Sequence, residues 1–307
     1  MTRLRIGTRG SQLATTQSGT VAASLHDHGV GSELVTVRTF GDDHPGPLAS
    51  MPQQGVFVSA LRSALLDGAV DVAVHSMKDL PSAPAAGIVL AAAPVREDPR
   101  DALVTADGHG LDRLAPGARV GTGSPRRQAR LRALRPDLEV VDLRGNVDSR
   151  LARVDSGDLD AVVLAVAGLT RLGRTERIAE HLDPVRLLPA PAQGALAVEC
   201  RADDAATRSL LAPLDDPATR LAVLAERAVL AGVHASCASA IGALASLAGD
   251  RLTLTADASG LHGEHVRVTR SATLPPGTPE ARAVATALGH AVAAMLLAAG
   301  AGSFLAR

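Results

Sequence analysis

The stretch VFVSALRSALLDGAVDVAVHSMKDLP, residues 56–81, joins a helix-like segment to a strand-like segment. Its first part, 56–68, has apolar residues at helical spacing and ends on Gly68, a residue type common just after a helix. The run Val-Ala-Val at 72–74 is typical of a buried strand. The same alternation continues on both sides of this stretch, so the sequence predicts an α/β protein with parallel sheets covered by helices.

Strand-like and helix-like segments alternate through the first two thirds of the chain. The expected strands are 4–8, 33–39, 71–76, 88–95, 118–122, 138–144 and 159–166. The expected helices are 56–68, 124–135, 146–156 and a helix that runs from an N-cap at Ser11 towards His28. The pattern then changes to a helix at 218–231, alternating strands at 251–259 and 265–271, and a helix near 279–299. This last region is predicted to be α+β with a small antiparallel sheet.

The length of 307 residues allows two or three domains. A charged, proline-bearing segment at 96–104 separates a first α/β unit from a second, and 189–201 has the pattern of a return crossing. We therefore expect three domains, which comprise 1–95 with 194–214, then 99–190, and then 217–307. The stretch 41–55 is rich in turn residues and is expected to be a mobile surface loop that covers a cleft.

The composition narrows the classes of partner. The chain has three Phe and neither Tyr nor Trp, so its core must consist of Ala, Val and Leu, and a base-stacking surface for nucleic acid lacks its usual platform. The net charge of −1 gives no general attraction to nucleic acid or to an anionic membrane. The N-terminus shows no signal peptide, and the most apolar segments, near 160–169 and 291–300, are expected to be too short to span a bilayer. A soluble, cytoplasmic protein is expected.

Polar side chains gather where the expected strands end. Ligands bind outside the carboxyl ends of strands in a parallel sheet, so these positions are candidates for a binding site. Lys78 is the only lysine in the chain, and it stands beside Asp79 directly after the strand-like run. The alternative for this pair is a surface ion pair that contributes little. The candidates are Thr8, Arg9, Ser11, Ser76, Lys78, Asp79, Thr122, Ser124, Arg126, Arg127, Arg144, Gly145 and Asn146.

The segment GTGSPRRQARLR, residues 121–132, is the richest of these candidates. Arg126 and Arg127 stand at the expected start of a helix, where the helix dipole disfavours cations unless an anion lies close by. A helix N-terminus and a guanidinium both bind carboxylate or phosphate well. The pair is therefore expected to form an anion site, whereas Arg130, Arg132 and Arg135 are interpreted as a solvated face.

The two cysteines occur in different sequence contexts. Cys200 lies in a strand-like segment and is expected to be in the core. Cys237 lies in a loop of small residues, where it is either a buried small side chain or an accessible nucleophile. His75 has no second ligand at metal-binding spacing, so no metal site is expected. These residues alone indicate a polyanionic small-molecule ligand and do not name a reaction.

Many segments, in the same order, resemble the porphobilinogen deaminase (hydroxymethylbilane synthase) family. The resemblance runs over nearly the whole chain, which makes it specific. It rests on RIGTRGSQLA (5–14), GVFVSALRSALLDG (55–68), DVAVHSMKDLP (71–81), VREDPRDALV (95–104), VGTGSPRRQARL (120–131), LRGNVDSRL (143–151), LDAVVLAVAGLTRLG (159–173), LPAPAQGALAVECR (188–201) and AERAVL (225–230).

The resemblance implies a fold, an activity and roles for residues. The fold would have two periplasmic-binding-protein-like α/β lobes and a C-terminal α+β domain. A dipyrromethane cofactor attached to Cys237 would accept four porphobilinogen units head to tail with loss of ammonia, and hydrolysis would release hydroxymethylbilane. Asp79 takes the catalytic role. The other carried-over positions, which bind cofactor or substrate, are Ser76, Lys78, Thr122, Ser124, Arg126, Arg127, Arg144, Arg9, Ser11, Arg150, Arg171 and Gln193. A monomer is expected.

The cysteine loop departs from the family pattern. It reads Ala235-Ser236-Cys237 where glycine commonly precedes the cysteine, and Ala240 replaces a usual proline. One alternative is therefore a deaminase homologue that has lost activity. The other alternative is a periplasmic-binding-protein-like module for a polycarboxylate, although binding alone would not require the thiol and the carboxylate.

Overall fold

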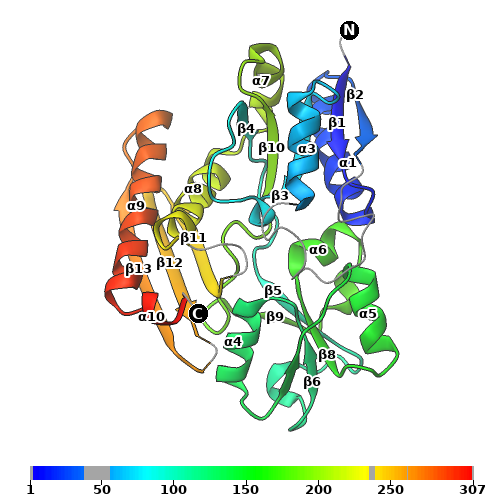
Figure 1. Cartoon of the computed structure of the whole chain (residues 1–307), viewed down its shortest axis with the longest axis vertical. Helices are drawn as coiled ribbons and strands as arrows, with labels where there is room; N and C mark the ends of the chain where they lie inside the picture. The colour runs from blue at the N-terminus through cyan, green and yellow to red at the C-terminus, as the bar shows by residue number, and fades with distance from the viewer. Residues whose placement is uncertain (1–2, 38–55, 235–238, 261, 306–307) are drawn as a thin grey trace. The chain divides into compact units, whose positions relative to one another are not determined.

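The computed structural model describes residues 3–37, 56–234, 239–260 and 262–305 (Figure 1). The chain forms two compact units. The first unit comprises Met1–Arg96 and Ala195–Arg220, and the second comprises Glu97–Gly194 and Leu221–Arg307. Each unit is described by itself.

The first unit is built on a five-stranded sheet with the order β2-β1-β3-β10-β4. Its strands are β1 (Leu4–Thr8), β2 (Ser32–Thr36), β3 (Val72–Ser76), β4 (Ile88–Ala92) and β10 (Leu196–Arg201). Its helical elements are α1 (Gln12–Asp27), α3 (Val56–Leu66), η2 (Met77–Asp79), α7 (Ala205–Leu211) and η5 (Ala212–Leu214). Apolar residues of α1 and α3 belong to two separate core clusters, with Val72 in one and Ala73 in the other. Because successive strand residues point to opposite faces, helices cover both faces of this sheet.

The second unit contains another five-stranded sheet, with the order β7-β6-β8-β5-β9. Its strands are β5 (Asp101–Thr105), β6 (Arg119–Gly121), β7 (Glu139–Val141), β8 (Ala161–Ala165) and β9 (Glu180–Leu182). Its helical elements are η3 (Leu111–Arg113), α4 (Pro125–Leu134), α5 (Val147–Asp155), α6 (Val166–Arg171) and η4 (Thr175–Arg177). Successive residues of one strand again belong to different core clusters: Val163 of β8 lies in one cluster and Val162 in the other.

The second unit also contains a three-stranded antiparallel sheet (Figure 1). This C-terminal sheet consists of β11 (Ile241–Ala248), β12 (Arg251–Ser259) and β13 (His265–Thr273). The helices of this part of the chain are α8 (Pro217–Gly232), α9 (Thr278–Ala298) and α10 (Gly302–Leu305). The core between sheet and helices consists of Ala, Leu, Val and Ile, as the lack of aromatic residues requires.

Helix α9 is long and apolar enough, by length and composition, to cross a membrane. The expectation that the apolar segments are too short to do so is therefore wrong for this helix. Its buried residues, among them Ala285, Val292 and Leu296, belong to the same core cluster as Leu252 and Leu254 of β12. Packing of one face against the C-terminal sheet accounts for its apolar sequence.

The predicted α/β class and the small C-terminal antiparallel sheet are confirmed. The prediction of parallel sheets is wrong for one strand in each α/β sheet. β10 runs antiparallel to β3 and β4, and β5 runs antiparallel to β8 and β9. β5 and β10 each follow a strand of the other sheet, β4 and β9 respectively, so neither is preceded by the helical crossover that joins parallel strands of one sheet.

Candidate active site

A tight turn at the end of β3 holds Ser76, Lys78 and Asp79. The strand ends at Ser76 and one turn of 3-10 helix, η2, follows at once. Met77 and Leu80 are buried, and the N–H of Met77 donates to the Ala195 carbonyl at 3.0 Å. These anchors leave the Asp79 side chain exposed and Lys78 half-buried. The turn therefore presents a carboxylate on a rigid support.

The residues that follow strand β1 lie at the same edge of the sheet as the turn that follows β3. β1 and β3 are parallel and adjacent, with Ile6 opposite Val72. Ser11 is confirmed as the N-cap of α1, since its hydroxyl accepts from the Ala14 N–H at 3.4 Å. Arg9 and Ser11 therefore follow the carboxyl end of β1, beside the carboxyl end of β3.

Ser76 has a buried partner on α1. The Nε2 of Gln17 donates to the Ser76 hydroxyl oxygen at 2.8 Å. Because this bond occupies an acceptor position, it leaves the Ser76 O–H able to donate to a ligand oxygen.

His75 belongs to a buried charged group behind this turn. The Arg62 guanidinium donates to both carboxylate oxygens of Glu199, at 2.9 and 2.7 Å, and His75 Nε2 lies 3.4 Å from Glu199 Oε2. Burial alone would raise the pKa of Glu199, but the contacts from Arg62 and His75 lower it to about 2. His75 is thus buried beside the Glu199 carboxylate.

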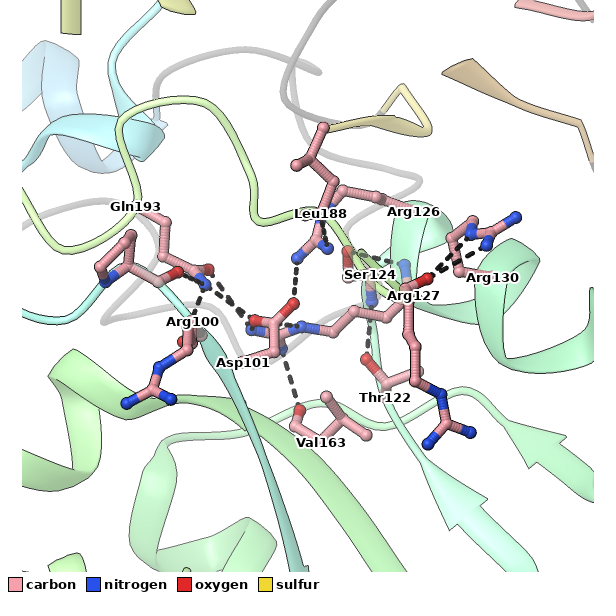
Figure 2. A network of polar contacts seen from close by, with 12 residues as sticks. Arg100, Asp101, Thr122, Ser124, Arg126, Arg127, Arg130, Val163, Leu188 and Gln193 are labelled. Atoms are coloured by element: carbon pink, nitrogen blue, oxygen red, sulfur yellow. Dashed lines mark hydrogen bonds and ion pairs between the residues drawn. The ribbon is translucent and has the colours of Figure 1, made fainter. Parts of the chain in front are cut away.

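The second unit contains a group of buried charged and polar side chains that bond to one another (Figure 2). We call it the Asp101 cluster and define it as Asp101, Arg126, Arg127 and Gln193. Asp101 is 0% exposed, and Arg126 and Arg127 are 2% and 5% exposed. Arg126 Nη2 donates to Asp101 Oδ2 at 2.7 Å, and Arg127 Nη2 donates to Oδ1 at 2.6 Å. The Nε2 of Gln193 also donates to Oδ1, at 2.8 Å. The Asp101 carboxylate thus accepts hydrogen bonds from two guanidiniums and one amide.

The charge of the Asp101 cluster is positive. Burial alone would raise the pKa of Asp101, but the charges of Arg126 and Arg127 hold it well below its usual range. Arg126 and Arg127 also donate to the backbone carbonyls of Leu188 and Val163, respectively. Arg127 donates in addition to Asp101 Oδ1 through Nε at 3.1 Å and to Gln193 Oε1 at 3.5 Å. Arg126 Nε is buried without a hydrogen-bond partner among the residues that the structure describes. Two guanidiniums and one carboxylate leave an excess of one positive charge among buried side chains.

The sequence did not identify Asp101. It stands in a segment, 96–104, that was interpreted as a charged crossing, and the structure shows the strand β5 beginning at this residue. The sequence signal that was available is the carboxylate at the start of the apolar run 102–104. Asp101 shows that Arg126 and Arg127 also have a structural role, which the interpretation as an anion site had not included.

α4 begins at Pro125, within the helix predicted at 124–135. Ser124 is the N-cap, and its hydroxyl accepts from the Arg127 N–H at 3.5 Å. Thr122 is buried, and its hydroxyl accepts from the Ser124 N–H at 3.3 Å. A Cβ at Gly123 would lie 2.6 Å from the Leu143 carbonyl oxygen, so only glycine allows the two loops after β6 and β7 to approach this closely.

Three further arginines of the second unit differ in exposure. Arg150 Nε donates to the Gly145 carbonyl at 2.9 Å, and Arg171 Nη2 donates to the Gly194 carbonyl at 2.6 Å. Burial lowers the pKa of both guanidiniums. Within the described ranges, neither forms an ion pair with a carboxylate. Arg144 is more exposed, and its Nε lies 3.6 Å from Asp142.

Of the two cysteines, Cys200 lies within the described residues. Cys237 and the stretch 41–55 lie outside the described residues. Cys200 is buried in β10, and burial raises its pKa to about 11. The prediction of a core position for Cys200 is therefore confirmed, and a thiol with this pKa is a poor nucleophile at neutral pH.

Comparison with known proteins gives a consistent family. The family model described as "Porphobilinogen deaminase, dipyromethane cofactor binding domain" matches residues 4–209. A porphobilinogen deaminase of Cutibacterium acnes is 50% identical over an alignment of 317 residues, gaps included. The alignment covers 97% of this chain and 95% of that protein. A porphobilinogen deaminase of Nocardia farcinica is 60% identical over 250 residues, covering 80% of this chain and 71% of that protein.

Solved structures include more distant similarities. A periplasmic substrate-binding protein of an ABC transporter from Coxiella burnetii is 17% identical, with a TM-score of 0.43, over 70% of this chain and 93% of that chain. The BvgS VFT2 domain of Bordetella pertussis is 18% identical, with a TM-score of 0.40, over 68% of this chain and 84% of that chain.

Proposed function

The chain belongs to the porphobilinogen deaminase family, and we propose that it performs this reaction on a dipyrromethane cofactor attached to Cys237. In this reaction four porphobilinogen molecules are condensed head to tail, each with loss of ammonia, and hydrolysis releases hydroxymethylbilane. The family match over residues 4–209 carries the proposal, because the matched domain is described as the one that binds the cofactor. The attachment residue rests on sequence, since Cys237 follows the AERAVL segment in a loop.

The second unit suits a cofactor with several carboxylates. When bound, the dipyrromethane supplies the pyrrole end to which new units are joined. Its acidic side chains need cationic partners, and the Asp101 cluster has an excess of one positive charge. In the part of the chain that the structure describes, Arg126 Nε has no acceptor, and this supports the fit because a buried donor without an acceptor is unfavourable.

We assign binding of the carboxylate groups of cofactor and substrate to individual polar residues. Arg150 and Arg171 offer partly desolvated guanidiniums, whose bidentate geometry matches a carboxylate. The remaining proposed positions offer hydroxyl, amide, ammonium or guanidinium donors. They are Arg9, Ser11, Ser76, Lys78, Thr122, Ser124, Arg126, Arg127, Arg144 and Gln193.

Asp79 is the proposed catalytic carboxylate. The turn η2 holds its backbone between buried Met77 and Leu80, so the exposed side chain is presented without a flexible loop. Ammonia leaves porphobilinogen together with its bonding electrons, so positive charge develops on the pyrrole. A fixed carboxylate near the pyrrole N–H stabilises that charge, and fixed charges of this kind supply much of the catalysis in many enzymes.

The domain division proposed from the sequence also fits the cores. The segments 1–95 with 194–214, 99–190, and 217–307 each contain one sheet, and each sheet has its own buried clusters. Cytoplasmic location, a monomeric state, and the absence of nucleic-acid or membrane partners stay predictions. Cell fractionation and size-exclusion chromatography with light scattering check the first two.

Intact mass of the purified protein tests the proposal. We expect the mass of the chain plus two pyrrole units, with the added mass on the peptide that contains Cys237, and release of hydroxymethylbilane from porphobilinogen. Unmodified protein that binds porphobilinogen without turnover would contradict the proposal and favour an inactive homologue. Binding of unrelated polycarboxylates with equal affinity would instead favour a binding module.

A further inference from the structure

Glu226 is a buried carboxylate outside the set of proposed site residues. It lies on α8 and is 0% exposed. Its Oε2 accepts from the Ala192 N–H at 2.6 Å, and its Oε1 accepts from the Ala245 N–H at 2.9 Å. A buried carboxylate is costly unless hydrogen bonds compensate it, so these two backbone groups are part of what keeps Glu226 in place.

The first partner of Glu226 is a strained residue. Ala192 is fully buried and has a φ of 60°, in the left-handed region that residues other than glycine rarely adopt. Such conformations persist only where the surroundings enforce them. The bond from Ala192 to a carboxylate is short and charge-assisted, and it holds the backbone in this conformation.

Ala192 begins the turn 192–194, which forms hydrogen bonds with proposed carboxylate-binding residues or contains them. Gln193 follows Ala192, and its side chain donates to Asp101 at 2.8 Å. Gly194 comes next, and its carbonyl accepts from Arg171 at 2.6 Å. The turn 192–194 therefore sets the position of one amide and one guanidinium of the site.

The second partner of Glu226 lies on β11. Glu226 is on α8, which ends at Gly232, and Ala245 is on β11, which begins at Ile241. Cys237 lies in the sequence between these two elements. One carboxylate thus fixes the helix before the cysteine to the strand after it, and β11 is further joined to the same turn region by the Ala243 N–H, which donates to the Pro189 carbonyl at 2.9 Å.

We propose that Glu226 is a positioning residue for the deaminase reaction, because its two hydrogen bonds hold the turn 192–194 and the elements on either side of Cys237 in one arrangement. This inference rests on the proposed function. Loss of the carboxylate should loosen both ends of this arrangement. Cofactor attachment and carboxylate binding should then weaken together, which a role in stability alone would not cause.

The test is Glu226→Gln. Glutamine keeps the size of the side chain, but its NH2 group faces a backbone N–H, so one hydrogen bond is lost and two donors oppose each other. We expect a smaller cofactor-loaded fraction by intact mass. For the loaded enzyme we expect a KM for porphobilinogen higher by about tenfold. This corresponds to about 1.4 kcal/mol, within the range for a buried hydrogen-bonding group left unsatisfied.

The matched control is Asp204→Asn. Asp204 is the N-cap carboxylate of α7 in the first unit. It likewise accepts a backbone N–H, from Thr207 at 2.9 Å, and it pairs with Arg201. We expect this variant to lose thermal stability and to keep the loading and the KM of the wild type. Equal loading and KM in Glu226→Gln would overturn the proposal and leave Glu226 with a structural role. Absence of cofactor from the wild type and the control as well would overturn the proposed function itself.

A second pair of variants keeps the test decisive. Glycine adopts positive φ without strain. Ala192→Gly added to Glu226→Gln should therefore lower the KM for porphobilinogen part of the way towards the wild-type value, while the cofactor-loaded fraction stays reduced. No restoration would contradict the role assigned to the strained turn. Where Glu226→Gln yields too little folded protein, Glu226→Asp gives the same readouts. The shorter carboxylate keeps its charge but cannot reach both N–H groups.

Discussion

At the residue scale, Asp79 and Lys78 carry the central chemical assignment. Asp79→Asn keeps the shape of the side chain and removes its charge, so substrate should bind while turnover falls at least ~100-fold, the usual scale for a lost electrostatic stabiliser. Steady-state kinetics measures both quantities. Lys78→Arg keeps the charge but replaces a compact donor with a planar fork, so it should also impair turnover. Near-normal turnover of Asp79→Asn would reduce the pair to surface charges.

Arg127 is expected to support stability as well as binding. In Arg127→Leu, Asp101 stays buried while one of its two cationic partners is lost. Breaking a buried pair in this way costs about 3–5 kcal/mol. Chemical denaturation measures the loss, and Arg144→Leu is the control because Arg144 is exposed. Equal stabilities of the two variants would show that Arg127 serves the ligand alone.

The Glu199 carboxylate should make stability depend on acid pH. Its pKa is about 2 in the folded protein against 4.5 as the ordinary value, so the folded state favours the charged form. The stabilisation is complete above pH about 4.5 and is lost as the pH falls towards 2, on the order of 3 kcal/mol in total. Glu199→Gln should therefore flatten the pH dependence of unfolding free energy in this window. An unchanged slope would show that other carboxylates set acid stability.

At the element scale, the sequence predicted local structure well and pairing less well. Ser11 was recognisable as an N-cap because capping depends on the next three residues. The strands β5, β9 and β11 were missed, and β10 was assigned without its reversed direction. Strand direction depends on partners distant in the sequence, such as Val198 and Val74, and no local pattern encodes it.

The same distinction applies to the candidate site. Residues at strand ends, such as Thr122 and Asp79, could be found because strand ends are visible in the hydrophobic pattern. Asp101 and Glu226 could not, because their roles come from partners brought together by tertiary packing: two guanidiniums for the first and two backbone N–H groups for the second. Buried carboxylates of this kind look like ordinary charged residues in the sequence.

At the scale of the whole molecule, the two cysteines allow a direct count of thiols. Cys200 is buried with a pKa of about 11, so it should not react with a thiol reagent in the native protein at pH 8. If Cys237 carries the cofactor, the native protein should show no reactive thiol and the denatured protein one. Titration with a chromogenic disulfide measures both. Two thiols after denaturation would show that the cofactor is attached elsewhere or is missing.

The reversed strand β10 also has a consequence for the order in which the chain can fold. It is inserted between β3 and β4, so residues 196–201 complete a sheet whose other strands all lie before residue 93. During synthesis the first unit must wait, with β3 and β4 lacking their shared neighbour, until about a hundred further residues have left the ribosome. Contacts of such sequence separation slow folding, and unpaired strand edges invite aggregation. A fragment that ends at Arg96 should therefore fail to form a stable sheet, although it contains four of the five strands.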